Sequence, residues 1–176
     1  MIYPTVMREM LLGVARRGAF TPLWSARILE EWRRAALKLG PEGAAQAEAE
    51  ALWLTRDWPK AEVPVKPGLE ARLWLPDPAD IHVLAAAIAG SADLIVTLNV
   101  KDFPRNILAE EGLSRADPDG FLMGIWQASP EIVGEAGQEV LAKARELSGE
   151  DWEMRALMKK ARLPRLGKAL SDLRAG

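Results

Sequence analysis

The segment from residue 71 to residue 98 constrains the fold more than any other part of the chain. It begins with ARLWL at 71–75, a short apolar run that ends before Pro76, and continues into the alanine-rich stretch 80–89, which is typical of a buried helix. LIVTL at 94–98 follows and is the clearest β-rich run. Strand, helix and strand in this order predict a βαβ unit, and therefore a parallel sheet with helices on its faces.

Helical patterns account for most of the remaining chain, because apolar residues recur at helical spacing and Gly or Pro residues lie at the ends. Upstream, we expect helices at 5–17, 23–39 and 43–57. Downstream, we expect a short helix after Pro104, an edge strand near Leu113, a helix opened by Asp117-Pro118, and only helices from Pro130 onward, with a break at Leu163-Pro164.

The composition excludes several classes of protein. The chain has no cysteine, so disulfides and thiolate metal sites are impossible. Its longest apolar stretch, 81–89, is interrupted by His82 and is far shorter than the roughly 20 residues that cross a bilayer. The first residues lack the pattern of a secretory signal. We therefore expect a cytoplasmic location.

Charge is unevenly distributed, although the net charge is only −2. The stretch 155–176 holds seven basic residues against the single acid Asp172, whereas 42–50 is acidic. Runs of this kind are most often solvated helix faces. The alternative is a surface that binds a polyanion or an acidic partner.

Acidic side chains flank the predicted βαβ unit. Sheets of this kind place their sites at the carboxyl ends of the strands. Asp77 follows ARLWL and the turn from Asn99 to Asp102 follows LIVTL, so these acidic loops are expected to converge on one edge, near Asp80. Together with Glu31 on the second helix, they offer oxygen ligands of the kind that suits Mg²⁺ or Mn²⁺, ions that can bridge a phosphodiester and activate a water.

Each of these residues also has a purely structural explanation. An aspartate at the cap (Asp77), a first-turn proline (Pro78) and an acid shortly after (Asp80) form a good helix start in their own right. Three further side chains can be ordinary turn or helix residues: Glu31, His82 and Asp102.

The run LPDPADIHVLAAAIAGSADLIVTLNVKDFP at 75–104 resembles the signature block of PIN-domain proteins, particularly the VapC-like toxins and their longer relatives. In that pattern an aspartate opens an alanine-rich helix, and a strand then ends in a T-x-N or T-x-D turn followed by D-F. SARILEEW at 25–32 is similar to the family's segment with a glutamate on the second helix, which the match places at Glu31, and residues 4–25 resemble the first helix and its lead into the second.

The resemblance implies an α/β fold, a PIN-like three-layer sandwich with a central parallel sheet at residues 1–126, followed by a helical C-terminal extension at 127–176. It also implies Mg²⁺- or Mn²⁺-dependent cleavage of RNA by the toxin of a type II toxin–antitoxin pair, with a cognate antitoxin protein as partner and a homodimer as a common state. The alternative is a catalytically impaired PIN-fold module that binds RNA or a protein.

The resemblance also assigns the site. Glu31, Asp80 and Asp102 take the positions of the catalytic acidic residues, and the metal ligands are the same three with Asn99 and, as an additional carboxylate, Asp77. The side chain of Thr97 would help to orient these ligands.

One departure from the family concerns the first residues. The family opens with a strand ending in an aspartate, which begins a D-x-x-x-L-Y-P-like stretch, whereas this sequence starts inside that stretch with Met1-Ile2-Tyr3-Pro4. We expect the true start to lie upstream, because the loss of a central strand would expose unpaired backbone in the sheet. Otherwise this form lacks one metal ligand.

Overall fold

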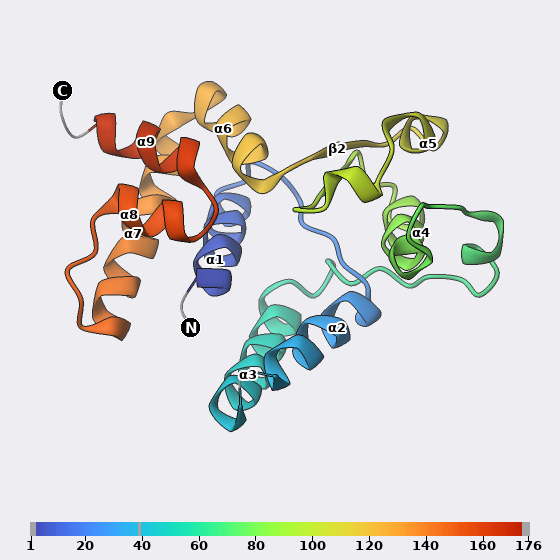
Figure 1. The fold of residues 1–176 in the computed structure, drawn as a ribbon, viewed down its shortest axis with the longest axis horizontal. Coiled ribbons are helices and arrows are strands. Elements are labelled where there is room, and N and C mark those ends of the chain that lie inside the picture. The colour runs from blue at the N-terminus through green and yellow to red at the C-terminus, as the bar shows by residue number, and fades with distance from the viewer. Residues whose placement is uncertain (1–2, 39, 174–176) are drawn as a thin grey trace. The chain divides into compact units, whose positions relative to one another are not determined.

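The structure, a computed structural model, describes residues 3–38 and 40–173 (Figure 1). Leu39, the expected end of the second helix, and Arg174, one of the basic residues near the end, lie outside the described residues, as do Met1 and Ile2. The described chain forms two compact units, one with residues 3–21, 96–98 and 116–173, and the other with residues 22–95 and 99–115. The predicted domain boundary after residue 126 divides the chain in another way from these two units, and it stays a prediction.

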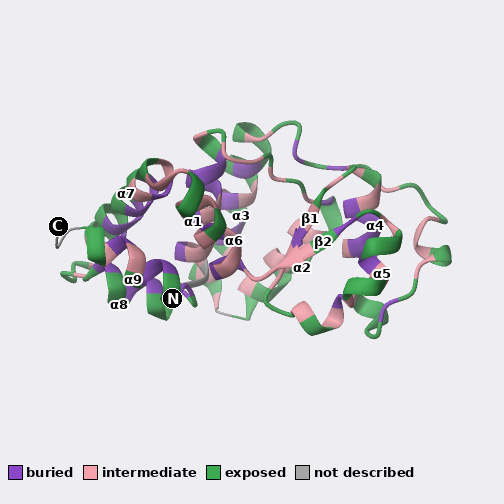
Figure 2. Cartoon of the chain, turned by 90° about the horizontal axis from the view of Figure 1, so that it is seen from above, coloured by how far each residue is buried: buried purple, intermediate pink, exposed green. Residues whose placement is uncertain are grey.

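The first unit is a helical bundle whose first helix comes from the start of the chain. Its helices are α1 (Tyr3–Arg16), α6 (Pro118–Ala128), α7 (Pro130–Ser148), α8 (Met154–Lys160) and α9 (Pro164–Asp172). Apolar side chains from all five fill one core, among them the fully buried Met10, Leu122, Leu141, Leu157 and Leu166. Figure 2 marks the buried stretches along these helices. The helical C-terminal pattern is thus confirmed, and the break at Leu163-Pro164 separates α8 from α9.

The second unit contains the remaining helices. These are α2 (Ala26–Leu37) and α3 (Pro41–Asp57), which pack against each other, then α4 (Ile81–Ala89) and α5 (Arg105–Glu110), with single 3-10 turns at η1 (Glu70–Arg72), η2 (Pro78–Asp80) and η3 (Val100–Asp102). A smaller core lies under α4 and α5 and consists of Leu75, Leu84, Ala87, Ile95, Phe103, Leu108 and Leu113. None of the described helices is long and apolar enough to cross a membrane.

Helix α2 begins later than the sequence pattern predicts. The pattern predicts a helix from residue 23, but Ser25 caps the helix, because its Oγ accepts a hydrogen bond from the Ile28 N–H at 3.2 Å. The residue before it, Trp24, forms an isolated parallel bridge with Glu62. This pairing holds the backbone extended up to the cap, and only tertiary contacts could have revealed it.

Two short strands, β1 (Leu94–Val96) and β2 (Ser114–Ala116), form the sheet of the described residues and run parallel. The Ser114 N–H donates to the Asp93 carbonyl at 3.0 Å, and the Thr97 N–H donates to the Ala116 carbonyl at 3.0 Å. The predicted strand at 94–98 is therefore confirmed for residues 94–96, and the strand predicted near Leu113 is confirmed as β2. The helix between the two strands is α5.

The predicted strand at 71–75 is wrong. Residues 70–72 form the 3-10 turn η1, and Leu73 is extended with φ −98° and ψ 152° but belongs to no strand. Leu75 is buried at 1 % exposure while Trp74 is 65 % exposed, so these neighbouring side chains face opposite sides, as they would in a strand. A strand also needs a hydrogen-bonded neighbour, which a local pattern cannot show. The expected βαβ unit around α4 does not form in the described residues, and the three-layer sandwich stays a prediction.

Candidate active site

Two aspartates at the start of α4, which the sequence could not tell apart, differ in what their side chains do. The Oδ1 atom of Asp77 accepts a hydrogen bond from the Ala79 N–H at 2.9 Å and caps the turn η2, in which Pro78 is the first residue. Asp80 stands at the cap position of α4, yet its side chain makes no capping hydrogen bond. The structural explanation therefore holds for Asp77, and the carboxylate of Asp80 is not used to cap the helix.

The carboxyl group of Asp80 lies in a strongly acidic environment. Burial raises the pKa of Asp80 most, and the negative charges of Asp77, Asp102 and Glu31 raise it further, while His82 acts in the opposite direction. The carboxyl groups of Glu31 on α2, Asp77 before η2 and Asp102 on η3 thus lie close enough to act on that of Asp80. The structure brings together the acidic residues that the sequence indicated.

Glu31 reaches this region through a contact with the only histidine of the chain. Its Oε2 atom lies 3.0 Å from Nε2 of His82, and its Oε1 atom accepts a hydrogen bond from Nε of Arg27 at 3.3 Å. The His82 side chain is only 3 % exposed, whereas that of Glu31 is 48 % exposed. The sequence interpretation took His82 as a histidine with satisfied hydrogen bonds. This is only half right, because its Nδ1 atom is buried without a hydrogen-bond partner in the described structure.

The turn after β1 carries Asn99 and Asp102. The Asp102 N–H donates to the Asn99 carbonyl at 3.0 Å, which forms η3, and neither side chain caps that turn. Phe103 is 2 % exposed and anchors the turn in the core. Arg115, which sequence reasoning did not single out, donates from Nη1 to the Phe103 carbonyl at 2.8 Å. The proposed orienting role of the Thr97 hydroxyl stays a prediction.

The acidic side chains have the chemistry that a divalent cation needs. Carboxylate oxygens suit Mg²⁺ or Mn²⁺, and a cation would relieve the repulsion that raises the pKa of Asp80. The positions do not match the chemistry, however, because no group of three or more His, Cys, Asp or Glu residues within 3–38 and 40–173 is arranged so that it could hold a metal ion. As placed here, the side chains form no such group, and the predicted ligand set stays a prediction.

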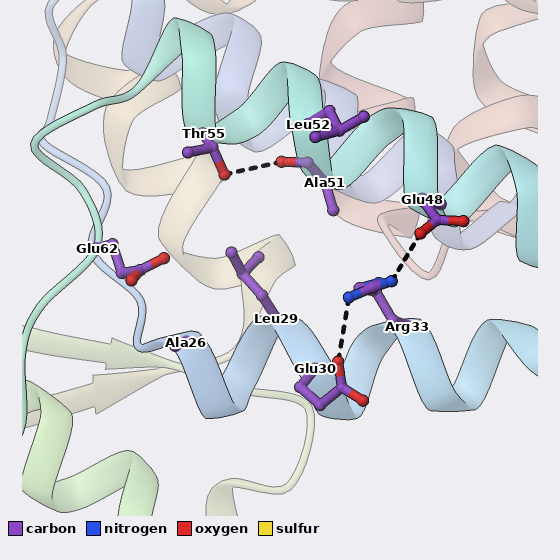
Figure 3. Close-up of a pocket in the computed structure, with 9 residues that line it drawn as sticks. All are labelled: Ala26, Leu29, Glu30, Arg33, Glu48, Ala51, Leu52, Thr55 and Glu62. Carbon is purple, nitrogen blue, oxygen red and sulfur yellow. Dashed lines mark hydrogen bonds and ion pairs between the residues drawn. The ribbon is translucent and has the colours of Figure 1, made fainter.

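A shallow groove of ≈ 460 Å³ lies between α2 and α3 (Figure 3). Arg33 on α2 reaches across it, binding Glu30 at 3.3 Å and Glu48 of α3 at 3.1 Å (Figure 3). Leu29 and Leu52 are the larger apolar side chains that line it. None of the predicted site residues lines this groove, and two of its three acidic side chains are paired with Arg33. We therefore place the candidate site at the start of α4 instead.

Comparison with known proteins identifies the family. A family model described as PIN domain matches residues 6–101, which is more than half of the 176 residues and includes Glu31, Asp80 and Asn99. No curated protein and no solved structure matches the chain. PIN domains are α/β proteins and in general nucleases, and the VapC-like subfamily is not distinguished by this match. On the extent of the match, the chain belongs to the PIN domain family.

Proposed function

We propose that the chain acts as a metal-dependent endoribonuclease of the PIN type, and more specifically as the toxin of a type II toxin–antitoxin pair in the cytoplasm. The family membership supports nuclease activity in general. The observation that carries the proposal is Asp80, a carboxylate that no helix cap uses and whose pKa is raised by burial and by three neighbouring acids. Charge repulsion of this kind is common at functional sites.

We assign the proposed roles to the acidic side chains around Asp80. Glu31, Asp80 and Asp102 are the catalytic residues, and Asp77 and Asn99 lie beside them. A Mg²⁺ or Mn²⁺ ion would supply neutralisation of negative charge on an RNA phosphate. The oxygen of Asp77 that caps η2 is already engaged, so this residue contributes mainly its charge.

A basic surface on α8, α9 and the turn between them supports RNA as the partner. We use this name for Arg155, Lys159, Arg162 and Lys168, which are all exposed. None of these four side chains has an ion-pair partner in the described structure, whereas Arg165 on α9 is held by Asp117 and Asp119. Cations that remain unneutralised suit the phosphates of a nucleic-acid strand.

The test compares RNA cleavage in Mn²⁺ and in chelator by the chain and by Asp80→Asn. We expect chelator to abolish cleavage and the substitution to lower it by about a hundredfold or more, since a metal-site residue should matter at least as much as its supporting residues. Asp93→Asn removes an exposed acid outside the group that acts on Asp80 and is the matched control. Equal rates for all three proteins would contradict the proposal.

The second candidate is a catalytically impaired PIN-fold module that binds RNA or a protein. It is favoured by one observation, the absence of a three-residue metal group among the described side chains. RNA binding without any cleavage, unchanged in Asp80→Asn, would favour this alternative. An antitoxin protein and a second copy of the chain are the protein partners that we propose for either function.

A further inference from the structure

We propose that His82 is a positioning residue, which holds the carboxylate of Glu31 at the candidate active site through Nε2. The inference rests on the proposed function, because that function makes Glu31 a catalytic residue. The contact joins α2 to the first turn of α4, with 3.0 Å between Nε2 of His82 and Oε2 of Glu31. Asp80 directly precedes this turn. The same contact therefore brings Glu31 toward Asp80.

Glu31 needs such a partner. Its side chain is half exposed, and ordering a long glutamate side chain costs up to about 2 kcal/mol of conformational entropy. The other contact, from Arg27, lies on the same helix four residues earlier and is 54 % exposed. Exposed pairs with this spacing contribute only about 0.3–0.5 kcal/mol, so the pair with Arg27 offsets only part of this cost. His82 is buried in the unit and supplies a fixed anchor.

Packing alone does not explain an imidazole at position 82. Its side chain is 3 % exposed, and Nδ1 is buried with no hydrogen-bond partner in the described structure. A buried polar atom without a partner costs about 1–3 kcal/mol, which an aliphatic side chain would avoid. Because the Glu31 carboxylate only accepts hydrogen bonds, Nε2 carries the hydrogen and donates it. The donor function toward Glu31 is thus what the imidazole provides.

The first test observes the contact itself by ¹⁵N NMR. His82 is the only histidine, so its imidazole signals need no assignment to a residue, and couplings to the ring protons distinguish Nδ1 from Nε2. We expect the spectrum of a protonated Nε2 and an unprotonated Nδ1. Glu31→Gln should shift the Nε2 signal, whereas Glu30→Gln, at the neighbouring residue that binds Arg33 and Arg34, should leave it unchanged. Equal spectra in the two variants would overturn the proposal.

The second test replaces His82 by two residues whose side-chain N–H donors lie at different distances from the backbone. The side-chain amide nitrogen of glutamine extends about as far as Nε2, while that of asparagine reaches only the position of Nδ1. His82→Gln should therefore keep the ¹³C carboxyl signal of Glu31 near its normal position, and His82→Asn should displace it. RNA cleavage should fall about 10–100-fold in His82→Asn and only a few-fold in His82→Gln.

The outcomes separate this inference from the proposed function. If both folded variants show the same Glu31 signal, His82 does not position the carboxylate and the inference is wrong. If the unmodified chain cleaves no RNA, the proposed function fails, while the Glu31 signal still decides whether His82 positions it. Unfolding curves of both variants show whether each is folded under the conditions of measurement.

Discussion

Asp119 on α6 accepts a hydrogen bond from the backbone N–H of Arg165 on α9, with 3.0 Å between Oδ2 and the nitrogen. Its other oxygen, Oδ1, accepts from the Leu166 N–H at 3.0 Å. Asp119 is 5 % exposed, and it thus caps a helix that lies more than forty residues later in the sequence. A helix N-terminus carries unsatisfied N–H groups and a partial positive charge, which a carboxylate compensates.

Asp119→Ala should therefore destabilise the unit that contains α9. We expect a loss of about 2–3 kcal/mol in the free energy of unfolding, because two backbone donors lose a charged acceptor. Asp119→Asn keeps one acceptor oxygen and should cost less. Urea unfolding measures the effect, and the exposed Asp172→Ala is the control. A cost no greater than that of the control would mean that the cap is unimportant.

Gly167 is expected to be required where α9 crosses α8. A Cβ atom at this position would lie 2.9 Å from Cβ of Met158 and 3.2 Å from the Arg155 carbonyl oxygen. Gly167→Ala should lower the free energy of unfolding by about 1–3 kcal/mol through overpacking. Gly124→Ala, on the exposed side of α6, where an added Cβ atom would meet nothing within 4 Å, should instead raise it by roughly 0.5–1 kcal/mol. Thermal or urea unfolding of both variants tests whether their free energies of unfolding change in opposite directions.

Neutralising the basic surface should weaken RNA binding in a salt-dependent way. Each of Arg155→Gln, Lys159→Gln, Arg162→Gln and Lys168→Gln should lower affinity for single-stranded RNA regardless of sequence. Each lost phosphate contact should reduce the slope of log K against log salt by about 0.7. Binding titrations at several salt concentrations, with the exposed Lys60→Gln as control, measure this slope. A slope that stays the same in all four variants would point to a solvated face without RNA contacts.

The pH dependence of stability should report the repulsion at Asp80. Burial and neighbouring acids raise the pKa of Asp80 in the folded chain above its ordinary value. The folded state then holds the proton more tightly than the unfolded state, so stability falls as pH rises from the ordinary pKa to the raised one. At neutral pH the ionised carboxylate is destabilising.

Asp80→Asn should therefore be more stable than the unmodified chain at neutral pH, and this advantage should vanish in acid below the ordinary pKa. Its side chain makes no capping bond that the substitution would break. Unfolding of both proteins across this pH range measures the difference. A constant difference at every pH would show that the carboxyl group of Asp80 is not perturbed.

The sequence by itself determined most of the helices and the acidic residues to examine. Apolar spacing, with Gly and Pro at the ends, depends only on neighbouring residues, and it predicted α1, α3 and α4 as well as the β1 run at 94–98. The start of α6 at Asp117-Pro118 was also predicted correctly, because a cap followed by proline is a local signal.

Only the tertiary structure decided how these elements combine. ARLWL has the alternating burial of a strand but no hydrogen-bonded neighbour, and Asp77 rather than Asp80 uses its side chain as a cap. The Glu31–His82 contact joins residues about fifty positions apart, and α1 packs into the same core as the C-terminal helices. Contacts of this kind depend on which distant segments meet after folding, and the local pattern of a single sequence does not contain that information.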